Sequence, residues 1–87
     1  DNNTFPALNL AINAIKTGGS APTILNASNE TAVGAFLENK IPFLSITKIV
    51  DLTLNKSNIC EITSIAEVLD ADTQARKIAE KFIKLES

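Results

Sequence analysis

The chain has 87 residues, 45% of them apolar and 21% charged, which are the proportions of a single small globular domain. Its net charge is −2, without the clustered Lys and Arg of a nucleic-acid-binding surface. No apolar run approaches the roughly 18 residues of a membrane span, and no secretory signal is visible. One cysteine cannot form an internal disulfide, so we expect a cytoplasmic protein without nucleic-acid or membrane partners.

Two residue types are missing from the chain. The absence of His removes the commonest general base and the commonest metal ligand. The absence of Met, even at position 1, leads us to expect an excised or processed piece of a longer product.

The first predicted helix covers Phe5–Thr17, with Thr4 as its N-cap and Pro6 in its first turn. The pair Gly18–Gly19 ends it. Helical spacing predicts one buried apolar stripe, made of Leu8, Ala11, Ile12 and Ile15.

The second predicted helix runs from Pro22 to about Asn39 and stops before Pro42, because the residue before a proline is pushed out of the helical region. It is apolar nearly all round, so we expect it to be the buried central helix. A third helix, capped by Ser45, extends to about Leu54. We expect its inward face to hold Ile46, Ile49, Val50 and either Thr53 or Leu54.

Residues 55–63 are predicted to form a loop, anchored by Ile59 and Ile62. Ser64 and Glu67 then have the spacing of a capping box. Helical spacing continues to the end through Ile65, Val68, Leu69, Ala75, Ile78, Ala79, Phe82 and Leu85. Asp70–Ala71–Asp72 leaves open whether this segment is one helix or two. The predicted fold class is all-α, a small bundle of three to four helices over residues 1–87.

The best candidate site is a polar cluster in the second helix, formed by Asn26, Asn29 and Glu30. We expect these groups to be buried in an apolar run, where an unpaired polar group costs about 1–3 kcal/mol. They are therefore interpreted either as a satisfied structural network, which we favour, or as a functional site.

Other motifs favour structural interpretations. Asp70 and Asp72 are two positions apart and cannot face one another on a helix, so an N-cap is favoured over a divalent-ion pair. Gly18–Gly19–Ser20 fits helix termination better than phosphate binding. Cys60 has no His partner and is expected to have no catalytic role. A solvated charged face is formed by Arg76, Lys77, Glu80, Lys81 and Lys84. No catalytic, cofactor-binding or metal-binding residue is predicted.

The order and spacing of several motifs, covering almost the whole chain, resemble the C-terminal helical domain of 1-deoxy-D-xylulose 5-phosphate reductoisomerases. These motifs are Phe5–Leu8, Gly18–Pro22, Leu25–Ala27, Asn29–Glu30, Ala32–Val33, Ala35–Leu37, Ile46–Val50 and Ser64–Ala79. Departures from the usual family residues occur at Thr23, Ser28, Thr31 and Gly34. Gly34 bears most on helix stability, since a mid-helix Gly costs up to about 1 kcal/mol relative to Ala.

The resemblance implies a part of a larger enzyme that converts 1-deoxy-D-xylulose 5-phosphate to 2-C-methyl-D-erythritol 4-phosphate with NADPH, in non-mevalonate isoprenoid biosynthesis. It implies NADPH and a divalent metal (Mg or Mn) in the full-length enzyme, none held by this part, and a homodimer. The implied partners are the catalytic and NADPH-binding domains of the same polypeptide, which this domain supports. The alternatives are a free-standing helical interaction module and, less favoured, a small enzyme in its own right.

Overall fold

The computed structural model describes residues 6–86 and, within them, four helices and no strand. The helices are α1 (Pro6–Thr17), α2 (Ala21–Leu37), α3 (Ser45–Lys56) and α4 (Ile65–Glu86). The all-α fold class is thereby confirmed. Thr4, the expected N-cap of the first helix, lies outside the described residues.

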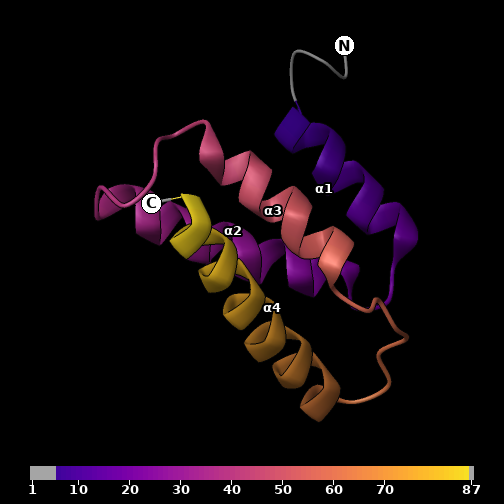
Figure 1. The fold of residues 1–87 in the computed structure, drawn as a ribbon. Helices are drawn as coiled ribbons and strands as arrows, with labels where there is room; N and C mark the ends of the chain where they lie inside the picture. The colour runs from indigo at the N-terminus through magenta and orange to yellow at the C-terminus, as the bar shows by residue number, and fades with distance from the viewer. Residues whose placement is uncertain (1–5, 87) are drawn as a thin grey trace.

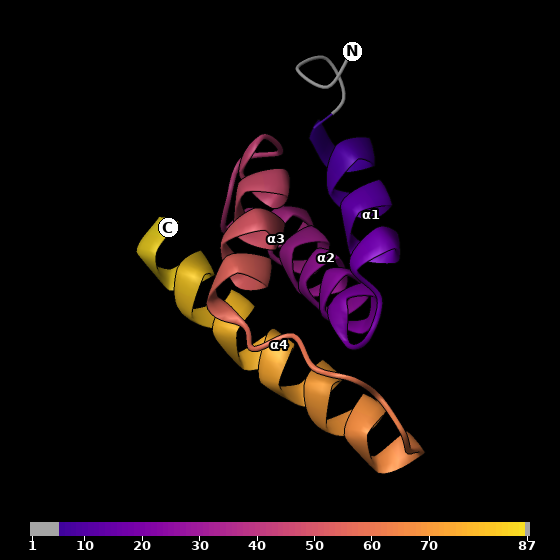
Figure 2. The same ribbon diagram turned by 90° about the vertical axis from the view of Figure 1, so that its right-hand side faces the viewer.

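Helix α2 is the centre of the bundle, as expected, because it contacts each of the other three helices. Helix α3 lies between α1 and α4, and α1 makes no contact with α4 in the described part of the chain. Figures 1 and 2 show α1 along one side of the molecule and the C-terminal end of α4 on the other. In the described part of the chain the bundle therefore has two outer helices, α1 and α4, and each packs only against α2 and α3.

Small side chains dominate the core. The larger cluster joins α2, α3 and α4 through Ala32, Ala35, Ile41, Ile49, Ala79 and Ile83, and the smaller one joins α2 and α4 through Ile24, Ala27 and Ala75. Alanine at a crossing allows two helix axes to approach closely, since the separation depends on the side chains at the contact. The hydroxyls of Ser28 and Thr53, both fully buried, donate to the carbonyls four residues earlier in their own helices, at 2.7 Å in each case.

The predicted faces of α1 and α4 need correction. In α1 the buried residue is Ala14, while Ile12 and Ile15 are 41% and 71% exposed. In α4 the buried residues are Ala75, Ala79 and Ile83, whereas three large residues of the predicted stripe, Ile65, Leu69 and Leu85, are exposed. In α1 the larger apolar side chains therefore lie outside the packed face. In α4 the predicted side is inward along the middle of the helix, where Phe82 packs against the core beside Ala79 and Ile83, and is exposed toward the helix ends.

The ends of the helices follow their local signals with two exceptions. Ser64 caps α4 as predicted, since its hydroxyl accepts a hydrogen bond from the backbone N–H of Glu67 at 3.2 Å. Asp70 and Asp72, however, lie inside one continuous α4, so neither is an N-cap. Ser45 is the first residue of α3 and not its cap, and its hydroxyl donates to the carboxylate of Glu86 at 3.1 Å. Of the two expected loop anchors, Ile62 is half-buried and Ile59 is exposed.

Candidate functional site

The polar cluster of α2 lies on the surface, so the expectation that it is buried was wrong. Asn26, Asn29 and Glu30 are all exposed. At 100° per residue they lie on the side of α2 that points away from its buried residues Ile24, Ala27, Ser28, Ala32 and Ala35. Because the buried face is built from small residues, the apolar content of the segment did not show which side was inward.

Glu30 connects α2 to α4 through Arg76. The guanidinium Nη2 of Arg76 lies 2.6 Å from Glu30 Oε2, and its Nε lies 2.9 Å from Asp72 Oδ2 one turn earlier in α4. The hydrogen bonds with Asp72 and then with Glu30 raise the pKa of Arg76 above its already high usual value. Glu30 therefore links α2 to α4 as one member of a charged triad with Arg76 and Asp72. The triad was not predicted from the sequence, although the spacing of four residues between Asp72 and Arg76 indicated that these two could pair on one helix.

Asn26 and Asn29 face a different feature, a groove of about 270 Å³ between α1, α2 and α3. The groove is lined by Leu10, Ala11, Leu25, Asn26, Asn29, Thr47 and Val50. Neither asparagine side chain forms a hydrogen bond with another residue of the described part. The three predicted site residues thus split into an ion-paired Glu30 and two asparagines that leave their amide groups available at the rim of an uncharged groove.

The Gly18–Gly19–Ser20 turn connects α1 to α2 and also holds a distant loop. Both glycines have positive φ, +73° and +56°, a conformation that L side chains rarely adopt. The backbone N–H of Ser20 donates to the carbonyl of Cys60 at 2.8 Å, and the N–H of Cys60 donates to Ser20 Oγ at 3.0 Å. A Cβ at Gly19 would collide with the same Cys60 carbonyl. These contacts support the helix-termination interpretation, because the N–H of Ser20 is already occupied by the loop.

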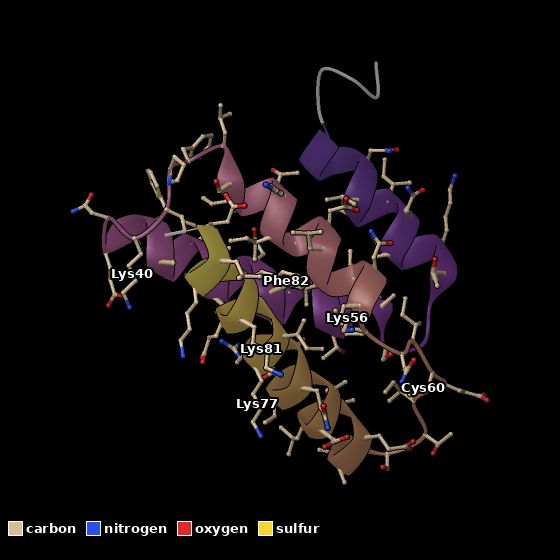
Figure 3. The ribbon with its side chains drawn as sticks, viewed as in Figure 1. Lys40, Lys56, Cys60, Lys77, Lys81 and Phe82 are labelled. Carbon is tan, nitrogen blue, oxygen red and sulfur yellow. The ribbon has the colours of Figure 1, made fainter. Side chains whose placement is uncertain are left out.

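The remaining candidates assemble no reactive centre in the described residues. The charged face of α4 is exposed apart from the half-buried Arg76, and the thiol of Cys60 is free and exposed. No group of three metal-ligating side chains gathers anywhere in residues 6–86. Figure 3 shows Lys77 and Lys81 of α4 pointing away from the bundle and Cys60 on the loop at its edge.

A further polar contact, which the sequence analysis missed, closes the other end of α4. Glu86 pairs with Lys48 of α3 at 2.7 Å and accepts the hydrogen bond from Ser45. The hydrogen bond with Lys48, and then that with Ser45, lowers the pKa of the Glu86 carboxyl. Ser45 and Glu86 are about 40 positions apart, so no local sequence pattern predicts this contact.

A sequence profile of the DXP reductoisomerase C-terminal domain matches residues 1–78. The chain belongs to this family. The match confirms the resemblance seen in the sequence.

Individual relatives agree with this assignment. The 1-deoxy-D-xylulose 5-phosphate reductoisomerase of Acinetobacter baumannii (strain SDF) is 51% identical over 84 residues, which are 97% of this chain and 21% of the relative. That of Acetivibrio thermocellus is 42% identical over 84 residues. The solved reductoisomerase of Zymomonas mobilis, in complex with NADPH, superposes on this chain with a TM-score of 0.90 at 44% identity. The superposition covers 95% of this chain and 22% of the Zymomonas mobilis chain. The chain thus spans about a fifth of the length of these relatives.

The structure has no helix among its described residues that is long and apolar enough to cross a membrane.

Proposed function

We propose that this chain is the C-terminal domain of an NADPH-dependent enzyme that converts 1-deoxy-D-xylulose 5-phosphate to 2-C-methyl-D-erythritol 4-phosphate. The observation that carries the proposal is the similarity, at a TM-score of 0.90 and 44% identity, to a reductoisomerase solved with NADPH. The proposal includes a cytoplasmic homodimer and extends to non-mevalonate isoprenoid biosynthesis. NADPH and the divalent metal belong to the other domains of the polypeptide.

The role proposed for the domain itself is to brace the catalytic domain. The proposal is supported by charged links between helices in the described residues, at Arg76 and at Glu86. Packing and polar links of this kind hold the walls of a neighbouring active site in a fixed geometry. Asn26, Asn29 and Glu30 would contribute to this support without touching the reacting atoms.

The test is an assay of the full-length gene product with and without residues 1–87, beside the isolated domain. We expect NADPH oxidation that depends on 1-deoxy-D-xylulose 5-phosphate in the full protein, none in the domain, and loss of the activity on deletion. A full-length product without this activity would contradict the assignment of function.

A substitution at Glu30 separates support from direct catalysis. In the full-length enzyme, Glu30→Ala removes the link to Arg76 and should lower the melting temperature, with turnover following stability. The matched control is Glu38→Ala, which breaks the exposed pair with Lys40 outside the helix crossing. A large loss of turnover with unchanged melting would show a direct catalytic role for Glu30.

A further inference from the structure

One side of α1 carries two large apolar side chains, Ile12 and Ile15, that the described bundle leaves 41% and 71% exposed. They are three positions apart and share a face of α1, whereas Ala14 is buried in the bundle, where α1 packs against α2 and α3. Ile15 is 71% exposed although α1 lies along the body of the molecule and is not a free end. An apolar helix face of this kind commonly marks an interaction surface.

The exposed face of α1 continues into the groove that holds the two asparagines. Ala11 lies 40° from Ile15 around the helix, and it lines the groove between α1, α2 and α3. Every residue that lines this groove is uncharged. By contrast, the hollow between α2 and α4 is lined by Glu30, Glu38, Lys40, Arg76, Glu80 and Lys84 among others. The centres of protein interfaces are depleted of charged residues, which favours the groove beside α1 over the charged hollow.

Asn26 and Asn29 give this surface its polar component. Each side-chain amide offers two donors and one acceptor, and in the described part of the chain these groups bond to no other residue. A partner seated in the groove would therefore present apolar side chains to Ile12, Ile15 and Leu25. It would also present polar or backbone groups to the two amides.

We propose that the surface formed by Ile12 and Ile15 and the groove beside Asn26 and Asn29 is where this domain docks onto the preceding part of its own polypeptide. The occupant follows from the comparisons, because the matched family is a C-terminal domain and the chain spans about 21% of its relatives. The rest of such a polypeptide enters at the end that carries α1, the helix nearest the N-terminus (Figure 1). A tethered partner has a high effective concentration at a nearby surface. The inference rests on the proposed function and specifies the surface through which the domain supports the enzyme.

Photo-crosslinking in the full-length protein tests the proposal. p-Benzoylphenylalanine replaces Ile15, and in a matched control it replaces Leu85, which is 80% exposed on α4, the helix that α1 does not contact. After irradiation, gel mobility separates crosslinks within one polypeptide from those between two copies, and peptide mass spectrometry locates the partner.

The expected result is a crosslink from position 15, at monomer mass, to peptides that precede Asp1, and none to those peptides from position 85. A crosslink from position 15 to a second copy would overturn the proposal in favour of a dimer surface. A crosslink confined to residues 1–87, or none, would also overturn it. The reductoisomerase assay on the same samples distinguishes the two failures, since an active enzyme with the wrong crosslink refutes only the docking surface.

Discussion

Helices α1 and α4 have the same kind of sequence pattern but are linked to the rest of the bundle to different extents. Both have large apolar residues at helical spacing that stay exposed, and both bury alanines, Ala14 in α1 and Ala75 and Ala79 in α4, to which α4 adds Ile83. Helix α4 is also fixed by charged side chains near its middle and at its end, whereas no described ion pair or side-chain hydrogen bond joins α1 to another helix. The difference indicates that α4 is held to the domain by packing and by polar links, whereas α1 is held by packing alone in the described residues.

The largest expected effect on stability is at the turn between α1 and α2, because this turn connects α1 to the rest of the bundle. Gly19→Ala should destabilise the domain by about 3 kcal/mol, since left-handed strain adds to the collision with the Cys60 carbonyl. Gly18→Ala, with open space around the new Cβ, should cost only about 1 kcal/mol. Denaturant unfolding measures both, and equal losses would show that the Cys60 contact does not restrict the turn.

Enlarging the buried alanines compares the two packed faces directly. Ala79→Leu should cost about 2–3 kcal/mol, because α4 is held against α2 and cannot move away from an overfilled crossing. Ala14→Leu should cost about 1 kcal/mol, because α1 can shift outward. Denaturant titration measures the free energy of unfolding of both variants. A larger loss for Ala14→Leu than for Ala79→Leu would show that α1, and not α4, is packed more rigidly.

The charged link between α2 and α4 should have a smaller and salt-dependent effect. Arg76→Met is expected to cost about 0.5–1 kcal/mol, since the ions are partly exposed and screened. The loss should shrink at high salt. Lys77→Met, at an exposed position of the same helix, is the control. A loss at Arg76 that is independent of salt would mean that packing of its stem, and not its charge, supports the crossing.

The smallest expected effect is on how the stability of the domain depends on acidic pH. The pKa of Glu86 is lowered in the folded state below the usual 4.5, chiefly by the hydrogen bond with Lys48. Its contribution to stability is therefore complete above pH 4.5 and is lost as the pH falls through the lowered pKa. Melting temperatures between pH 6 and pH 3 should fall less steeply for Glu86→Gln than for the parent chain. The control is Glu80→Gln. If the melting temperature of Glu86→Gln falls with pH as steeply as that of the parent chain and of the control, the ion pair of Glu86 does not contribute to stability.

The sequence was sufficient to predict the helices because their boundaries depend on local signals. The glycine pair and Ser64 with Glu67 each mark a boundary through a residue's own backbone preference or a neighbour within one turn. Pro42 disfavours helix at Ile41, although α2 already ends at Leu37. The exceptions were also local, since Asp70 and Asp72 are as compatible with a helix interior as with a cap. There Asp72 pairs with Arg76 one turn later.

The faces of the helices and the site could not be predicted in the same way. In α4 the predicted side is inward at Ala75 and Ala79, while its large apolar residues toward the two ends, Ile65, Leu69 and Leu85, are exposed. In α1, close packing at Ala14 buried a different side from the one that carries the large apolar residues Ile12 and Ile15. The same effect placed Asn26 and Asn29 on the surface. The contacts of Gly19 with Cys60 and of Ser45 with Glu86 each join residues about 40 positions apart, so no local pattern records them.

Hydrogen exchange of the backbone amides, compared between the full-length protein and the 87-residue chain, tests most directly whether α1 depends on the rest of the polypeptide. Helix α4 serves as the internal standard, because its contacts lie within the domain. If α1 depends on the rest of the polypeptide, α4 should exchange similarly in both samples, and α1 should exchange about tenfold more slowly in the full-length protein. Equal protection of α1 in the two samples would contradict this dependence.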